Sequence, residues 1–493
     1  MNRIIYLLAL AMASAPMAIL AQNSDSLALT LEQVVKMAQE ESLQSHAAKN
    51  RYMNGFYENK SFWRSFYPEI SAEGTLPDLN RSLSRITQND GTDVFVDRSQ
   101  AVSNLDINLQ QKIALTGGTV SVTSGIDRID LFGNNTSTSY LSRPIGISLV
   151  QPVFGFNSMV WDIKLREVQE EQFLKRYDED LEEVARLASQ NFFQLLQAEI
   201  MLKTAEQNKA YNDTIFQISK GRYSMGKIAE NELLQIELAL LNSDMALRQA
   251  KLSYTIAELR LKNYLGITAE VRLKAKVKED IPQIEIDLDK AIQMALTNNS
   301  NQIQWEANQL NADRQVANAK AGQRPNIDLF ANYGLSRSAA SLDEVYQDPQ
   351  DQQLLRVGFR VPIVNWGRAK ADYQAAMAQQ EVTSANYQIA LLEFQQEVLS
   401  QVKNFELKYK EVELAIRADE VAAKRFFVTQ QRFKIGKIGM TDLNIAIREK
   451  DDARRNYVNA LQSFWNSYYE LRKLTHYDFR NQQIIEHDTP EVR

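Results

Sequence analysis

Few side chains in this sequence could carry chemistry. It has no cysteine, and its three histidines, His46, His476 and His487, are scattered and mostly near the chain ends. Disulfide scaffolds, thiolate metal sites and cysteine catalysis are therefore excluded. Paired carboxylates such as Glu170-Glu171 lie in helical, charge-alternating stretches and are typical of solvated helix faces. We predict a protein that is not an enzyme, with no catalytic residues, metal ligands or cofactors.

One segment looks like a phosphate-binding loop. Residues Gly221 to Lys227 match most of a P-loop, whose glycines and lysine cradle a phosphate. However, Ile228 follows where a magnesium-binding Ser or Thr is needed, and no strand pattern precedes the segment. The related segment in the second half has Gln431 in place of the first glycine. We therefore interpret both segments as turns that reverse a helix, where glycine supplies the backbone conformation.

Proline and glycine positions define the elements that carry these turns. The proline-free stretches 156–265 and 368–489 each contain one close pair of glycines: Gly221 and Gly226 in the first, Gly436 and Gly439 in the second. This pattern predicts two very long helical tracts, each reversing at its glycine pair. A helix over residues 156–220 would be about 100 Å long, which is too long for an ordinary globular helix.

The two halves of the chain are copies of one another. At an offset of 257 residues, Leu31-Glu32 and Met37-Ala38 match Leu288-Asp289 and Met294-Ala295. At an offset of 210 residues, Arg222-Tyr223-x-x-Gly226-Lys227-Ile228 matches Arg432-Phe433-x-x-Gly436-Lys437-Ile438. The first copy therefore contains 47 extra residues. Both long helices carry a heptad-like apolar stripe, formed by Leu181, Val184, Ala188, Phe192, Leu195 and Leu202 and by Leu391, Phe394, Val398, Val402, Phe405 and Val412.

Between the helices the hydrophobic period changes from 3.6 to 2. Alternating residues mark strands around 105–109, 120–122 and 145–149 in the first copy and around 327–335 and 355–363 in the second. The 47 extra residues contain Thr116-Gly117-Gly118 between two alternating segments, which leaves open an additional strand pair or outer loops. A soluble sandwich with one wet face would give the same alternation.

The N-terminal residues and the net charge indicate where the protein acts and which partners it does not bind. Residues 1–21 are typical of an export signal, with an N-terminal membrane anchor as the alternative. Beyond them no window approaches 18 consecutive apolar residues, so a membrane-crossing part would have to be a closed β-barrel. Because about eight strands form the smallest closed barrel, four to six strands per chain require oligomerisation, and three chains with four each would give twelve. The net charge of -6 argues against binding nucleic acid.

This ordered set of features resembles the outer-membrane efflux proteins of the TolC type. The resemblance covers the chain to about residue 474 and rests on the duplicated plan, on residues 148–154 entering the long helix, and on the repeated Arg-aromatic-x-x-Gly-Lys turns. It implies a mixed fold, in which a trimeric transmembrane β-barrel with about four strands per chain continues into an α-helical coiled-coil barrel in the periplasm. The absence of cysteine means that no acylated N-terminus is available, unlike in some family members.

The function implied by the resemblance is a passive exit channel in the outer membrane, belonging to a tripartite efflux or secretion system. Its partners would be two more copies of the chain, a periplasmic adaptor (membrane fusion) protein, an inner-membrane pump and outer-membrane lipid. The cargo stays open among drugs, metal ions, amphiphiles and polypeptides. The alternative is a soluble periplasmic coiled-coil scaffold or adaptor, which the strand pairs at matched places in both copies disfavour.

We expect a signal peptide (1–21), a first repeat (22–286), a second repeat (287–474) and a loosely held polar tail (475–493). The first repeat would contain a helix (30–66), strands (69–153), a long helix (156–220), a tip (221–231), a helix (232–265) and an equatorial linker (266–286). The second would contain a helix (287–322), strands (326–363), a long helix (366–431), a tip (432–441) and a helix (442–474).

The resemblance also implies two sites at the tips. The adaptor would dock on the turns at Gly226, Lys227, Gly436, Lys437 and Gly439. The acids Glu232 and Asp442 fall where the family has acids at the periplasmic gate, and threefold symmetry would make each a ring that attracts cations. Phe433 and Ile438 replace a tyrosine and an arginine of the best-known pattern, so apolar packing would hold the gate closed. Alternatively, the lysines only aid solubility and the acids only favour helix starts.

Overall fold

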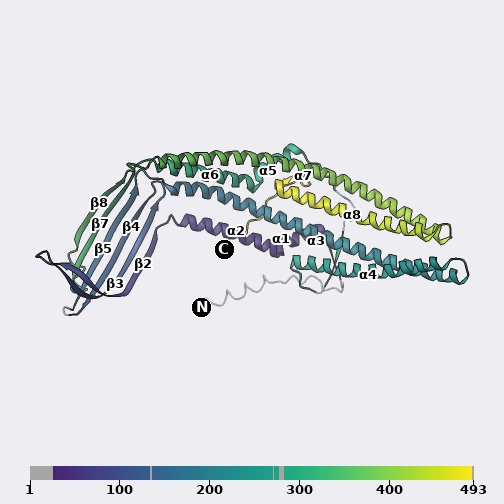
Figure 1. Cartoon of the computed structure of the whole chain (residues 1–493), viewed down its shortest axis with the longest axis horizontal. Helices are drawn as coiled ribbons and strands as arrows, with labels where there is room; N and C mark the ends of the chain where they lie inside the picture. Colours follow the sequence, from purple (N-terminus) through teal and green to yellow (C-terminus); the bar gives the residue numbers. More distant parts are fainter. Residues whose placement is uncertain (1–25, 134–135, 270, 277–281, 491–493) are drawn as a thin grey trace, which may run out of the picture. The chain divides into compact units, whose positions relative to one another are not determined.

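The computed structural model describes residues 26–133, 136–269, 271–276 and 282–490. The predicted signal peptide lies outside the described residues. The chain divides into two compact units. The hairpin unit comprises residues 1–48, 178–294 and 398–487, and the sheet unit comprises residues 49–177, 295–397 and 488–493. Figure 1 labels the elements of both units.

The helices confirm the tandem duplication, because each helix of the first copy has a counterpart of identical length in the second. The pairs are α1 (Leu31–Glu41) with α5 (Leu288–Asn298), α2 (Leu43–Arg64) with α6 (Ser300–Ala321), α3 (Ser158–Ser224) with α7 (Arg368–Lys434), and α4 (Glu230–Leu265) with α8 (Met440–Thr475). The long helices α3 and α7 have 67 residues each. None of the helices that the structure describes combines the length and the apolar character needed to cross a membrane.

The first helix of each copy is broken, whereas the sequence predicted one helix over 30–66 and one over 287–322. Ser42 is extended and buried, and its hydroxyl accepts a hydrogen bond from the Ser45 backbone N–H at 3.0 Å. Asn299 is also extended, and its side chain caps α6 by accepting from the backbone N–H of Asn301. Short polar side chains that cap a following helix commonly end the preceding one.

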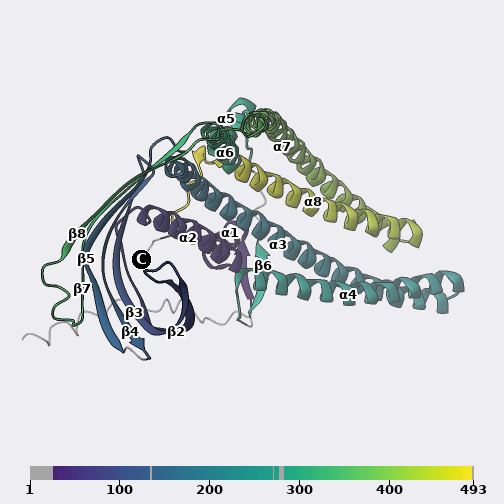
Figure 2. The ribbon, with the colours of Figure 1, turned by 60° about the vertical axis from the view of Figure 1, so that its left-hand side comes forward.

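In the part of the chain that the structure describes, the sheet unit contains one antiparallel sheet of six strands, and Figure 2 shows its curvature. It contains β2 (Glu69–Thr87), β3 (Asp93–Ile113), β4 (Gly118–Phe132), β5 (Ser137–Pro152), β7 (Asn326–Ala339) and β8 (Gln350–Arg360), in the order β2-β3-β4-β5-β7-β8. The chain therefore has six strands in this sheet, which are the expected four and the additional pair that the sequence left open. The longer first copy supplies four of them, since β3 and β4 pair continuously from Ser99↔Phe132 to Ile113↔Gly118.

The two faces of this sheet differ in chemistry. One face exposes large apolar side chains: Ile70, Leu105, Ile107, Ile145, Ile147, Tyr333, Leu355, Val357 and Phe359. The other carries a charged cluster in which Arg143 lies 2.8 Å from Asp106 and 3.0 Å from Asp127. Gly125 lies close beside this cluster, and a Cβ added there would displace the Asp106 carboxylate, since it would lie 1.9 Å from one of its oxygens.

The core of the hairpin unit follows the predicted stripes. Phe192, Phe193, Phe405 and Phe464 are among its largest fully buried side chains. The predicted linker over 266–286 contains a strand that the sequence did not reveal: β6 (Arg272–Lys276) pairs in parallel with β1 (Ser26–Thr30). The paired residues Ser26 and Arg272 are 246 residues apart in sequence. Local sequence patterns therefore could not predict the pairing of these two short strands.

The segment after α8 is packed rather than loosely held, which corrects our expectation for residues 475–493 in the part that the structure describes. Its buried side chains are His476, Tyr477, Asp478, Phe479 and Ile485. The chain reverses at His476, which has a left-handed conformation with φ of 50°, and β9 (Tyr477–Asp478) then pairs with β10 (Gln483–Ile484). The sequence did not indicate this packing, because most residues of the segment are polar and its few buried apolar side chains do not form a recognisable pattern.

Candidate functional site

The two predicted tips are turns with the same backbone geometry. In the first, Gly226 has a φ of 67°, and the backbone N–H of Lys227 donates to the carbonyl of Arg222 at 2.9 Å. In the second, Gly436 has a φ of 74°, and Lys437 makes the equivalent bond to Arg432, also at 2.9 Å. This arrangement is a Schellman helix end, in which a left-handed glycine lets the last helical carbonyls find donors.

The other tip glycine has a different role. Gly439 has a φ of -85° and precedes α8 as its N-cap, and the equivalent residue in the first copy is Ala229 with a φ of -83°. An alanine therefore fits the backbone at this position. Both tip lysines, Lys227 and Lys437, are exposed. A hydrogen bond of 3.5 Å from Arg222 to the Lys434 carbonyl links the last turns of α3 and α7.

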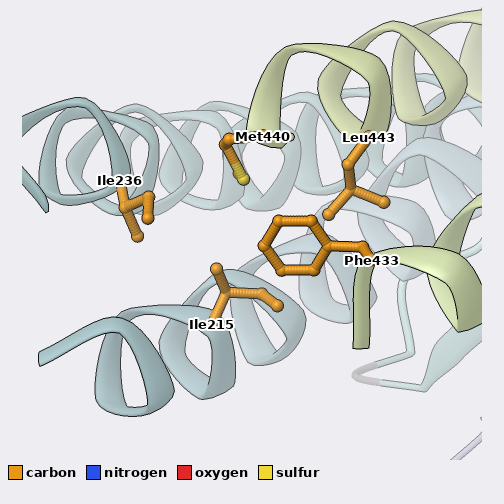
Figure 3. Close-up of a cluster of buried hydrophobic side chains, with 5 residues drawn as sticks. All are labelled: Ile215, Ile236, Phe433, Met440 and Leu443. Carbon is orange, nitrogen blue, oxygen red and sulfur yellow. The ribbon is translucent and has the colours of Figure 1, made fainter. Parts of the chain in front are cut away.

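Phe433 lies at the centre of a small apolar cluster, which we call the tip cluster. Its buried members are Ile215 from α3, Ile236 from α4, Phe433 from α7, and Met440 and Leu443 from α8. Figure 3 shows the Phe433 ring among the other four side chains. Ile438, the second apolar gate candidate, is partly buried against the cluster. The tip cluster therefore joins the α3–α4 hairpin to the α7–α8 hairpin.

The two acidic gate candidates lie in the first turns of α4 and α8. Glu232 is half-buried and Asp442 is exposed. Neither helix has a side-chain cap at its N-terminus. A carboxylate in the first turn interacts favourably with the positive end of the helix dipole. The positions thus suit both a helix-start role and a role in a charged ring.

Tyr211 on α3 packs against the tip cluster and was not predicted from the sequence. Its ring meets Phe426 edge-on with centroids 6.2 Å apart. Burial raises the pKa of Tyr211 to about 12. Its hydroxyl has no hydrogen-bond partner among the residues that the structure describes. Tyr211 falls two residues past the heptad position 209, outside the predicted stripe, and its partner on α7 is more than 200 residues away, so the sequence contained no signal for this contact.

A groove with a volume of about 1170 Å³ lies between α3, α4 and α8. Small and amide side chains form much of its wall, and charged ones stand at one side. Representative lining residues are Asn208, Asn242, Ser243, Ala246, Arg448 and Arg455. Small residues allow a helix to approach closely, and amides and arginines can hydrogen-bond a polar helix face.

A second link between α3 and α8, which we call the clasp, consists of Glu182, Arg472 and Asp478. Arg472 binds both carboxylate oxygens of Glu182 at 2.9 Å and contacts Asp478 at 3.3 Å. Glu182 is fully buried, and Tyr468 donates to Asp478 at 2.6 Å. The imidazole of His487 lies 3.3 Å from Glu182. The clasp thus uses the segment after α8, for which the sequence predicted only a loosely held polar tail.

Charge pairing in the clasp outweighs the effect of burial. Burial alone raises the pKa of a carboxyl group, but His487 and the Arg472 guanidinium together hold the pKa of Glu182 below its ordinary value. The pKa of Asp478 is also lowered, since the Tyr468 hydroxyl and Arg472 overcome its burial. Both acids are therefore ionised at neutral pH.

The fold defines a class of protein. It matches the outer membrane channel CmeC of Campylobacter jejuni with a TM-score of 0.66 and 15% identity, over 93% of this chain and 87% of that one. It matches the open state of the MtrE outer membrane channel of Neisseria gonorrhoeae with a TM-score of 0.60 and 15% identity, over 94% and 91%. It matches the outer membrane protein VceC of Vibrio cholerae with a TM-score of 0.61 and 13% identity, over 91% of this chain and 95% of that one. The chain has the fold of outer membrane channels.

The family follows from the sequence match. The family model of the outer membrane efflux proteins matches residues 65–267 and 291–475. The chain therefore belongs to the outer membrane efflux protein family, as the resemblance predicted. The family and the structural neighbours are channels rather than enzymes.

Curated relatives match over shorter lengths. Toxin and drug export protein A of Aggregatibacter actinomycetemcomitans is 28% identical over 123 residues, which are 25% of this chain and 26% of that protein. An uncharacterized protein of Haemophilus influenzae is 24% identical over 153 residues, 30% of this chain and 31% of that protein. The matches thus span less than a third of either relative.

Proposed function

We propose that three copies of this chain form an outer-membrane exit channel that passively conducts cargo delivered by an inner-membrane pump and a periplasmic adaptor. In this proposal the sheets of the three copies close a β-barrel in the outer membrane, and their helical hairpins line a tunnel in the periplasm. Membership of the outer membrane efflux protein family supports this proposal. The similarity to a toxin and drug export protein favours export as the direction of transport.

The observation that carries the proposal is a pair of exposed apolar stripes on two helices of the hairpin unit. Both stripes follow a heptad-like spacing, and each member is at least 40% exposed. On α4 they are Leu234, Leu238, Leu241, Met245, Leu252, Ile256 and Leu259, and on α7 they are Leu399, Leu407, Leu414, Val421 and Val428, with Ile435 directly after the helix. Such stripes are the seams of coiled coils, so each needs a helix from another chain.

Because the two stripes are different surfaces, a neighbouring copy would join α4 of one chain to α7 of the next. Contacts between unlike surfaces are heterologous, and they close into a ring when the rotation between copies permits it. A ring of helical hairpins encloses a tunnel. The arrangement of stripes therefore supports a cyclic oligomer over a simple two-fold dimer.

We place the gate and the docking surface at the tips. Phe433 and Ile438 would hold the closed state through the tip cluster, and Glu232 and Asp442 would form charged rings at the opening. The adaptor would dock around Gly226, Lys227, Gly436, Lys437 and Gly439. The groove between α3, α4 and α8 has the small and polar lining that a helical hairpin of an adaptor requires.

The proposal is tested by locating and weighing the protein. We expect it in the outer-membrane fraction, and in mild detergent we expect a mass of three chains. Replacing Leu238 and Leu241 with aspartate should dissociate the oligomer, because two charges would enter an apolar seam. Replacing Gln235, an exposed polar residue on α4, with aspartate is the matched control and should leave the mass unchanged. A monomer of wild-type protein, or recovery in the soluble periplasmic fraction, would contradict the proposal.

A further inference from the structure

The six-stranded sheet ends in two edges, β2 and β8, which pair on one side only within the described chain. Five successive pairings, from β2–β3 to β7–β8, are antiparallel. With an even number of strands, β2 and β8 therefore run in opposite directions. An edge strand offers unpaired N–H and C=O groups to another strand, and these two edges can pair with each other only in the antiparallel sense.

The edges carry complementary charges on the same face of the sheet. On β2, Glu69 and Glu73 lie on the face opposite to Ile70. On β8, Arg356 and Arg360 lie on the face opposite to Phe359. All four charged side chains are exposed. The apolar face is also exposed at both edges, at 70% for Ile70 and 77% for Phe359.

We propose that the β2 edge of one copy pairs with the β8 edge of the next copy in a single register, with Glu69 opposite Arg360 and Glu73 opposite Arg356. This inference rests on the proposed trimer and adds the surface through which its sheets join. The partner is a second copy of this chain. Three sheets of six strands then close a barrel of eighteen strands rather than the twelve that four strands per chain would give.

Two constraints select this register. A shift by one residue would place the charged face of one strand beside the apolar face of the other. A shift by two residues keeps the faces but separates the charges, placing Glu69 opposite Gly358 in one direction and Glu73 opposite Gly358 in the other. Only the proposed register pairs both glutamates with both arginines. On the other face it places Ile70 opposite Phe359.

Pro77 limits the length of the seam. It lies in β2 at a register shift between Thr75 and Asp78, and proline lacks the backbone N–H that a ladder requires. The seam therefore extends over residues 69–75 of one copy and 354–360 of the next. A barrel of eighteen strands belongs to the size class that leaves an aqueous channel. The extra strand pair of the first copy thus widens the pore.

A cross-link between copies tests the seam, and the cysteine-free chain makes it specific. Both Ser71→Cys and Gly358→Cys are introduced into the same chain. In the proposed register, the cysteine at position 71 of one copy then lies directly opposite the cysteine at position 358 of the next copy. Opposed residues of antiparallel strands are close enough for a disulfide. Gly358 tolerates a side chain, since an added Cβ would lie 3.7 Å from its nearest neighbour, the Asp328 carbonyl. We expect covalently linked trimers on a non-reducing gel after mild oxidation.

Shifted pairs are the matched controls. Ser71→Cys with Arg356→Cys and Ser71→Cys with Arg360→Cys test the registers displaced by two residues, and both should link at least tenfold less. Stronger linking in a shifted pair, or no linking in any pair of an intact trimer, would overturn the inference. A trimer by mass without cross-links contradicts only the seam, whereas a monomeric wild-type protein contradicts the proposed function.

Charge reversal provides a second test that does not depend on disulfide geometry. Glu73→Arg should lower the temperature at which the trimer dissociates in detergent, because two arginines would then face each other across the seam. Arg356→Glu added to Glu73→Arg should restore that temperature. If the double variant dissociates at the temperature of the single variant or below, Glu73 and Arg356 are not partners and the register is wrong.

Discussion

The clasp and the tip cluster both join α3 to the second half of the hairpin unit, but they use opposite chemistry. The clasp pairs the fully buried Glu182 with Arg472 through two hydrogen bonds of 2.9 Å. The tip cluster has only apolar side chains around Phe433, and its flanking turns are exposed. A buried ion pair is costly to break because each partner would remain as an uncompensated charge, whereas a small apolar contact separates at a modest cost.

This difference assigns two mechanical roles. The clasp holds one geometry, since any displacement of Arg472 takes its guanidinium away from two buried carboxylates, those of Glu182 and Asp478. In the proposed channel the tip cluster would open and close, because its side chains would lose only packing and gain hydration when they part. Regions that move in proteins are drawn from the parts with low local stability. In the proposed channel the clasp is therefore the fixed point and the tip is the gate.

The largest effect is expected from breaking the clasp. Arg472→Met should destabilise the hairpin unit by about 3–5 kcal/mol, because the buried Glu182 would be left with the His487 imidazole and the buried Asp478 would lose its guanidinium partner. Thermal unfolding of the detergent-solubilised protein measures this loss. The control is Arg454→Met, which removes a half-exposed partner of Asp419 and should cost about 0–1 kcal/mol. Equal effects of the two variants would show that the clasp is not an anchor.

Acidification should weaken the same link. The pKa of Glu182 is lower in the folded protein than its ordinary value of 4.5, so its contribution is fully present above that pH and is lost as the pH falls further. The unfolding temperature of the wild type should therefore fall below pH 4.5 more steeply than that of Glu182→Gln. Parallel curves for the two proteins would mean that Glu182 does not contribute through its charge.

A smaller effect on stability, but a large one on conduction, is expected at the tip. Phe433→Ala removes the central ring of the tip cluster, and we expect a loss of about 3 kcal/mol locally and a channel that stays open. Phe427→Ala, which removes a ring that is 61% exposed on the same helix, is the matched control. Single-channel conductance in planar bilayers should rise for Phe433→Ala only. A rise in both variants would indicate a general loosening of α7.

The two glycines of the second tip separate backbone geometry from surface contact. Gly436→Ala should cost about 1–2 kcal/mol, because alanine resists the left-handed conformation. Gly439→Ala should be neutral, since its φ of -85° suits any residue and the first copy has Ala229 there. Thermal unfolding distinguishes them. If Gly439→Ala reduces export without changing stability, Gly439 acts in docking rather than in folding.

The sequence predicted those features of the two regions that depend on local or repeated patterns. The glycine turns were visible because the left-handed position recurs in both copies, and the core of α3 was visible through its heptad spacing. Phe433 was singled out through the family resemblance, since it replaces a tyrosine of the best-known gate pattern. The predicted positions of the tip residues still leave their roles in gating and docking as proposals.

The clasp was not predicted, because Glu182 is 290 residues from Arg472 in sequence and both segments look unremarkable alone. Glu182 is preceded and followed by acidic residues of an apparently solvated face, and Asp478 falls in a segment with a polar average. The additional strand pair was left open against outer loops for a related reason. The pairing of β3 with β4 depends on register over 15 residues of each strand, which alternation alone does not reveal.

The smallest energetic effect is expected from the two acids near the tip. Glu232→Gln with Asp442→Asn should change stability by less than about 1 kcal/mol per site, since each acid contributes mainly through the helix dipole. In the proposed trimer, however, each acid is repeated three times around a narrow opening, and such rings attract cations. Reversal potentials in a salt gradient should therefore shift away from cation selectivity. Lys227→Gln with Lys437→Gln, which neutralises exposed cations of the same turns, is the control and should not shift selectivity in that direction. Unchanged reversal potentials in the acid variant would leave these two residues with a helix-start role alone, and the gate would then depend on the packing of Phe433.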